Sequence, residues 1–340
     1  QRRDQRGNKM SKNQTFQGVK FESPKTLEKA CEAFGFDFMP EAKDIYFEDE
    51  IRDEEGNIKW VDGKMLTEMK RDERYVEIVH GKTRDRFDIV GSGYVIVPYK
   101  EAFDFADDLL QNGWSIIGGL ALNKGEKAYM LLEDGQKIPT GNNEFIVNRI
   151  TLMSSHDGSG KIEIRSTPSC TASGVAITTD ASRPLSFKHT RNVNQRLQRA
   201  NKVLSSVTKT WGEFSASAKK MQHVSITDEQ ARKFISDVIP AGAKESTRLD
   251  NIHAELFEIY KFKGTSTKLP MCKGTLFGIV MAVCEWSDGF RTVRASNKRD
   301  TVSAALESKL TMDGARKKAR AWGLALHLAK GKGSTLPIKK

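Results

Sequence analysis

The stretch EFIVNRITLMSSHDGSGKIEIRST, Glu144–Thr167, decides the fold class of this chain. Two runs with the residue pattern of β-strands flank Asp157-Gly158 and Gly160, and the second of them alternates between charged and apolar residues. Aspartate and glycine are the residues that tight turns between strands require. The pattern therefore predicts two antiparallel strands joined by a turn.

The second of these strands separates its side chains by charge. Successive side chains of a strand point to opposite faces, so Lys161, Glu163 and Arg165 share one face and Ile162 and Ile164 share the other. The apolar face belongs in a core. The charged face is left for solvent or for a ligand.

Further elements are predicted on both sides of this hairpin. Helices are expected over residues 24–36 and 100–111, and Asn112-Gly113 ends the second one. Turn residues at 53–57 suggest a hairpin tip, and alternation predicts strands at the positions that follow. These positions are 74–80, 93–98, 115–122, 127–133 and 185–188.

A long helix follows the strands. Nine apolar residues occur at alternating spacings of four and three, which is one face of a helix, namely Val193, Leu197, Ala200, Leu204, Val207, Trp211, Phe214, Ala218 and Met221. The simplest interpretation is a helix packed over the preceding sheet, and a coiled-coil contact is the alternative. The later chain has helical patterns. The prediction is an α+β fold with an antiparallel sheet and long helix (a β-β-β-α-like core) and a mostly helical C-terminal region.

Composition divides the chain into five parts. We predict a flexible basic arm at residues 1–20 and a mixed acidic region at residues 21–90. Residues 91–223 form the predicted sheet-and-helix core, which is also the expected nucleic-acid-binding part. Residues 224–329 are expected to be helical, and 330–340 to form a basic tail.

The charge of the chain favours a polyanionic partner. The net charge is +11, from 55 Lys+Arg and 44 Asp+Glu. The positive charge is concentrated late in the chain: 182–223 holds nine Lys/Arg and one acid, whereas 41–88 holds fifteen acids and ten bases. A basic strand face beside a basic helix could follow a phosphate backbone. The predicted phosphate contacts are Arg149, Lys161, Arg165, Lys188, Arg191, Arg196, Arg199 and Lys202.

The sequence lacks the motifs that are typical of several other classes of function. The four cysteines are scattered without CxxC spacing, and there is no GxxxxGK[ST], GxSxG or HExxH sequence. We therefore expect no metal and no cofactor. No apolar run reaches membrane-spanning length and no secretory signal is recognisable, so a cytoplasmic protein without a membrane partner is expected.

His156-Asp157 leaves an enzymatic alternative open. The pair could serve a metal-dependent nuclease or a nucleotide-modifying enzyme. Adjacent residues of an extended chain point to opposite faces, which argues against shared chemistry. A third possibility is a structural or regulatory phage protein that binds RNA or another protein.

Three segments in order resemble a family of phage and plasmid proteins grouped as domain of unknown function 932: GSGYVIVPYKEAFDFADDLL, SSHDGSGKIEIRSTPSC and SFKHTRNVNQRLQRA. The resemblance spans about Arg84 to Ala329. The order of strands and long helix is also similar, remotely, to the single-strand annealing proteins of the Red beta, Erf and Rad fifty-two type. That similarity implies a non-enzymatic recombination protein that binds single-stranded DNA. It also implies a homo-oligomeric ring or filament, with an exonuclease or a single-strand binding protein as a partner.

Overall fold

The computed structural model describes residues 23–179, 185–192, 202–241, 246–291, 301–310 and 312–331, without the side chains of 202–206 and 301–303. These residues form an α+β structure whose strands precede most of its helices. The predicted fold class is confirmed. The basic arm and basic tail of the prediction lie almost wholly outside the described residues.

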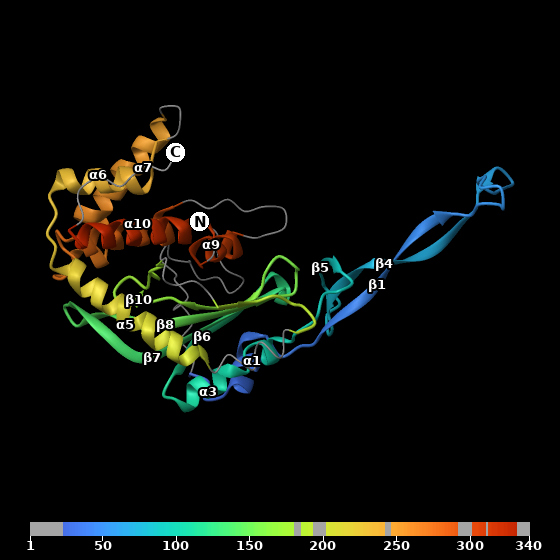
Figure 1. Cartoon of the computed structure of the whole chain (residues 1–340), viewed down its shortest axis with the longest axis horizontal. Helices are drawn as coiled ribbons and strands as arrows, with labels where there is room; N and C mark the ends of the chain where they lie inside the picture. Colours follow the sequence, from blue (N-terminus) through green and yellow to red (C-terminus); the bar gives the residue numbers. More distant parts are fainter. Residues whose placement is uncertain are drawn as a thin grey trace, which may run out of the picture.

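An antiparallel sheet forms the centre of the molecule (Figure 1). Its path is β11-β9-β8-β7-β6, and the short strand β10 also pairs with β8. The predicted strands 115–122, 127–133, 144–154, 161–167 and 185–188 are confirmed, with β7 longer than expected. The bounds are β6 (Ser115–Leu122), β7 (Lys127–Gly141), β8 (Glu144–Ser155), β9 (Ile162–Ser166), β10 (Ser169–Cys170) and β11 (Leu185–Phe187).

Three short helices cover one face of this sheet: α1 (Leu27–Phe34), α2 (Tyr99–Ala102) and α3 (Phe105–Gln111). Ile162 and Ile164 point into the apolar core that they form, as predicted. The helix expected over 100–111 is interrupted, because Phe103 leaves the helix and is buried in this core. Gly119 of β6 admits the ring of Phe34 where any Cβ would collide with it.

The expected strand at 93–98 is not formed. Its backbone is irregular, and Val95 hydrogen-bonds with His189 through both its N–H and its carbonyl. The residues between Gly91 and the helices therefore cross the end of the sheet instead of extending it. Local alternation could not reveal this, because the partner lies 94 residues later.

The second layer is helical and contains the other large apolar core. Its centre is α8, whose ten residues are all buried. Thr227 and Gln230 form a capping box at the start of α6. The helices are α5 (Lys202–Gln222), α6 (Asp228–Val238), α7 (Thr247–Glu258), α8 (Leu276–Glu285), α9 (Thr301–Leu310) and α10 (Asp313–Ala329), with short 3-10 or π turns at Asn123–Gly125, Ile259–Lys263, Ser266–Lys268 and Trp286–Phe290.

The apolar stripe of α5 is buried from Val207 to Met221, as its spacing predicts. The stripe is divided between two cores. Val207 belongs to the core between the sheet and the three short helices, whereas Trp211, Phe214, Ala218 and Met221 belong to the core of α8 and α10, which also contains Ile138, Ile146 and Cys170 of the sheet. The helix thus connects the two layers, because its two ends face different apolar surfaces. The stripe residues Val193, Leu197 and Ala200 lie outside the described residues.

A long two-stranded ribbon projects from the body (Figure 1). It consists of β1 (Pro40–Glu50) and β4 (Thr67–His80), and β5 (Arg86–Gly91) pairs with only the base of β4. The predicted turn at 53–57 lies near the far end, where Asp53 accepts hydrogen bonds from the N–H groups of Glu55 and Asn57. A small hairpin of β2 (Trp60–Val61) and β3 (Lys64–Met65) completes the tip.

Among the described helices, none combines the length and the apolar character that crossing a membrane would require.

Candidate nucleic-acid interface

The Asp157-Gly158 turn lies at the end of the sheet and buries its histidine completely. His156 is 0 % exposed, and its ring lies 4.3 Å from the Tyr99 ring and 6.2 Å from the Phe87 ring, centroid to centroid. Neither ring nitrogen has a hydrogen-bond partner within the described residues. Burial, reinforced by His189, lowers the pKa of His156 to about 3. His156 is therefore a neutral core residue at physiological pH.

This histidine makes acid stability a measurable property of the site. In the unfolded chain, His156 binds a proton below its ordinary pKa of 6.5. In the folded protein, His156 stays neutral until about pH 3. Stability from this group is therefore lost as pH falls. Between pH 7 and pH 4, we expect the free energy of unfolding of His156→Phe to rise by about 3 kcal/mol relative to that of the unsubstituted protein.

The measurement is urea unfolding of both proteins at several pH values. The difference between the two proteins is the quantity to follow, because the nearby carboxyls of Glu126 and Asp157 contribute to both. His189, whose pKa burial also lowers, is common to both as well. A difference that stays constant across this pH range would contradict the assignment.

The side chain of Asp157 points away from that of His156 and belongs to a buried ionic network. Its carboxylate lies 3.0 Å from Nζ of Lys127, which also lies 2.6 Å from Glu307 on α9. Burial and the neighbouring Asp157 raise the pKa of Glu126 to about 7. Burial alone would raise the pKa of Asp157, but its bonds to Ser159 and Lys127 outweigh burial and lower that pKa. Lys127 thus joins the turn, the sheet and α9.

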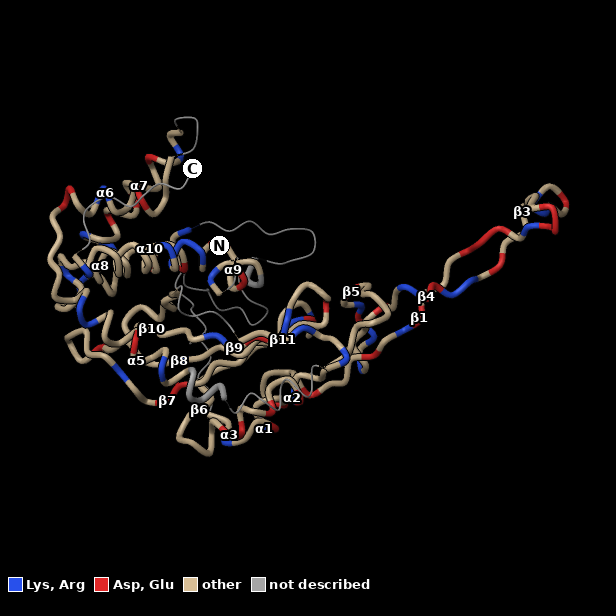
Figure 2. Tube along the Cα trace, in the orientation of Figure 1, with Lys and Arg blue, Asp and Glu red and all other residues tan. Residues whose placement is uncertain are grey.

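Three exposed cations surround this end of the sheet. Lys161 directly precedes β9, and Lys188 directly follows β11. Because the antiparallel register of the two strands ends at Ile162 and Phe187, the two lysines are the next residues of neighbouring strands at the same end. Arg191 follows three residues later and is also exposed. We call Lys161, Lys188 and Arg191 the cationic rim; Figure 2 shows how lysine and arginine positions are distributed along the chain.

The rim concentrates like charge. None of its three side chains forms an ion pair with a described residue. Like charges opposite one another on neighbouring strands repel, so an anion placed between them is favoured. Beneath Lys188 and Arg191, the His189 ring stacks on Tyr94 at 4.9 Å, and the Tyr94 hydroxyl donates to the Ser155 carbonyl. This packing ties the rim to the end of β8.

Two predicted contacts have acidic partners instead. Arg149 is buried and donates to Glu133 of β7 at 2.8 Å, and Arg165 donates to Glu163 of its own strand at 2.9 Å. Their charge is therefore matched within the sheet. Lys202 begins α5, although its side chain is not described, and Arg196 and Arg199 lie outside the described residues. The structure thus brings Lys161, Lys188 and Arg191 together and separates Arg149 and Arg165 from them.

The arrangement does not combine His156 and Asp157 into one reactive group. The imidazole is enclosed by aromatic rings, and the carboxylate faces Lys127. Within the described ranges, no three His, Cys, Asp or Glu side chains are placed to hold a metal ion. The sequence did not predict the network of Glu126, Lys127 and Glu307. No local pattern reveals it, because Lys127 and Glu307 are 180 residues apart.

The fold and rim thus define an α+β protein with a cationic surface at one end of an antiparallel sheet. Residues 86–308 match the family described as Domain of unknown function (DUF932). The chain therefore belongs to this family, as the resemblance in its motifs predicted. No curated protein matches the chain. No solved structure matches it either.

Proposed function

We propose that this protein binds single-stranded DNA and anneals complementary strands in homologous recombination of a phage or plasmid. The cationic rim is the observation that carries the proposal. Lys161, Lys188 and Arg191 are exposed, adjacent and without a described carboxylate partner. In the sequence, Arg196, Arg199 and Lys202 follow the rim. A run of basic residues suits a phosphate backbone better than an isolated anion.

In this mechanism the protein performs no covalent chemistry. Lysine and arginine side chains neutralise the phosphates of one strand and leave its base edges free for a complementary strand. The Arg149–Glu133 and Arg165–Glu163 pairs have the role of holding the strand face of the sheet, because their charges are already matched. Each phosphate contact is weak, so several protein copies on one strand would supply the affinity.

The enzymatic alternative rests on His156 and Asp157, and the observed geometry favours it less. A general base must reach the proton that it removes, whereas His156 is completely buried. The alternative of an RNA-binding phage protein uses the same cationic rim. It differs from our proposal in the preferred nucleic acid, which the experiment below distinguishes.

The test is fluorescence anisotropy of a labelled single-stranded DNA, titrated at several salt concentrations beside duplex DNA and structured RNA. We expect tighter binding to the single strand, with log affinity falling by about 0.7 per neutralised phosphate for each unit of log salt. The protein should also accelerate the pairing of complementary strands in a fluorescence-quenching assay. Equal weak binding to all three nucleic acids, or a preference for the RNA, would overturn the proposal.

A further inference from the structure

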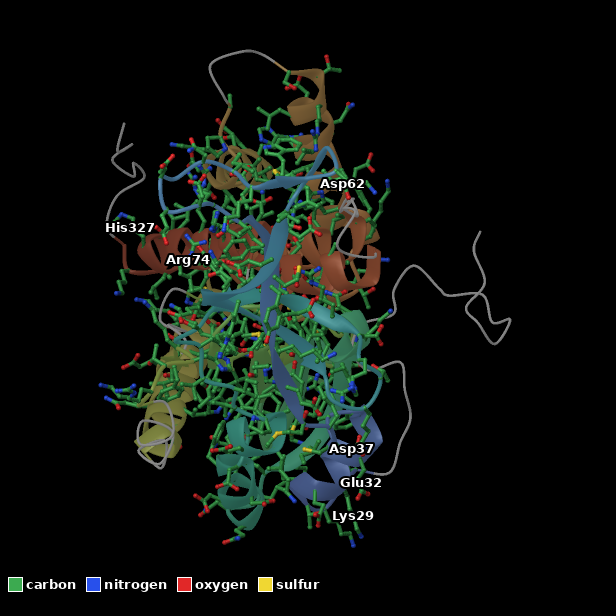
Figure 3. The ribbon with its side chains drawn as sticks, turned by 90° about the vertical axis from the view of Figure 1, so that its right-hand side faces the viewer. Lys29, Glu32, Asp37, Asp62, Arg74 and His327 are labelled. Carbon is green, nitrogen blue, oxygen red and sulfur yellow. The ribbon has the colours of Figure 1, made fainter. Side chains whose placement is uncertain are left out.

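The ribbon of β1 and β4 is exposed to an unusual degree for a folded segment. Beyond Tyr75, which pairs with Gly91 of β5, the described residues form no third strand along it, and almost every residue is exposed or half-exposed. Its large apolar side chains are among those in contact with solvent: Tyr46, Phe47, Trp60, Val61, Met65, Met69 and Tyr75. We call residues 45–75 the arm, which is a different segment from the basic arm predicted at residues 1–20. In Figure 3 the arm points toward the viewer, with Asp62 at its tip.

Two large exposed apolar side chains share one face of the arm, and others lie at its tip. Tyr46 pairs with Arg71 and Glu48 pairs with Met69, so Tyr46 and Met69 are diagonal neighbours on the same face. These two side chains are 54 % and 61 % exposed. At the tip, Trp60 pairs with Met65, and Trp60 is 61 % exposed. Large apolar groups exposed close to one another mark a surface that binds another macromolecule.

An isolated two-stranded hairpin is only marginally stable in water. The arm must therefore gain stability elsewhere. Its own ion pairs, Lys70–Asp49 at 2.7 Å and Arg71–Asp44 at 2.8 Å, are exposed and contribute little. Binding to another surface would bury the apolar face and cover the open strand edges. An interface of standard size takes about 20–30 residues from each side, which a segment of this length can supply.

The charge of the ribbon indicates which surface it binds. Residues 40–80 carry thirteen Asp/Glu and seven Lys/Arg, which leaves 31 Asp/Glu and 48 Lys/Arg for the rest of the chain. Two such acidic ribbons repel each other, so arm-to-arm pairing is disfavoured. Acidic side chains also discourage edge-to-edge strand pairing. DNA is disfavoured for the same electrostatic reason, whereas the basic body of a second copy attracts the arm.

We propose that the arm of one copy docks on the basic body of a second copy of this chain. The exposed apolar side chains of Tyr46, Met69 and Trp60 supply the buried contact, and the surplus acids Glu48 and Glu73 supply the complementary charge. Neither acid forms an ion pair with the described part of the chain. Since arm and body are different surfaces, each copy can both donate an arm and receive one. The arm precedes the residues that match the DUF932 family, so this docking is a property of the segment before them.

The experiment compares the full chain with a variant that lacks the arm. Asp44 and Val76 are paired, so replacing residues 45–75 by Asn-Gly closes the shortened hairpin with a two-residue turn. The base of the ribbon keeps Ile78 in the core of the body. Sedimentation velocity without DNA is expected to show dimers or larger assemblies for the full chain and monomers for the variant. Raising the salt concentration should dissociate the assemblies.

A pair of charge reversals provides the second comparison. Glu48→Lys together with Glu73→Lys leaves the ribbon intact and should weaken association about tenfold or more. The matched control is Glu213→Lys with Glu229→Lys, two exposed acids of the body on α5 and α6, which changes the net charge equally and should not weaken association. A full chain that stays monomeric at tens of micromolar, or an armless variant that assembles equally well, would overturn the proposal. Neither outcome depends on DNA, so docking and nucleic-acid binding are tested separately.

Discussion

Replacing Lys161, Lys188 and Arg191 together by glutamate is expected to weaken single-stranded DNA binding by about 100-fold or more. Each substitution removes a cation from the rim and puts an anion in its place. All three side chains are exposed, so the fold is expected to persist. The salt dependence supplies a second readout, because losing three phosphate contacts lowers the slope of log affinity against log salt by about 2.

The matched control reverses three lysines elsewhere on the surface. Lys219 and Lys220 lie in the last turn of α5, and Lys268 lies before α8; all three are exposed. Replacing these three by glutamate changes the net charge by the same amount. If both triple variants lose the same affinity, binding follows overall charge and the rim has no special role. Circular dichroism and thermal unfolding would establish that each variant is folded.

Replacing Lys127 by methionine is expected to produce the largest loss of stability, about 3–5 kcal/mol. Lys127 is 8 % exposed, and Glu307 is 2 % exposed. Methionine fills similar space but leaves Asp157 and Glu307 as buried charges without their shared cation. The loss is measured by chemical unfolding at neutral pH. The exposed Lys161→Met variant, with an expected change within about 0.5 kcal/mol, serves as the control.

A double-mutant cycle with Glu307→Gln identifies the contact responsible. The double variant is expected to lose less stability than the two single variants together, because both single changes remove the same Lys127–Glu307 contact, which the double variant loses only once. Strict additivity would mean that Lys127 and Glu307 do not stabilise each other. Because Glu307 belongs to α9 and Lys127 to β7, their coupling also measures how firmly α9 is held on the sheet.

These two predictions concern neighbouring features with different origins. The rim comes from residues that the sequence analysis selected, and the ionic network from residues that it did not. Lys161 and Lys188 could be selected because a strand pattern assigns each side chain to a face. The partners of Arg149 and Lys127 could not, because the pairing of β7 with β8 and the position of α9 depend on contacts across the chain.

The strands from Ser115 to Ser166 were predictable because alternation and turn residues act over a few neighbours. The same holds for α6, whose capping box lies within four residues. The stripe of α5 predicted its buried face correctly. It did not reveal that this face is divided between two apolar cores, and only the packed structure assigns Val207 to one and Trp211 to the other.

The amino-acid order was therefore sufficient for the α+β class, the strand faces, the turn at Asp157-Gly158 and the excess of positive charge. Tertiary packing decided the rest: it buried His156, matched Arg149 with Glu133 and left Lys161 and Lys188 open at the same end of the sheet. It also extended the ribbon of β1 and β4 away from both cores (Figure 1). The physical reason is the distance along the chain over which each effect acts. Backbone patterns act between near neighbours, whereas burial and ion pairing depend on residues that meet only after the chain has folded.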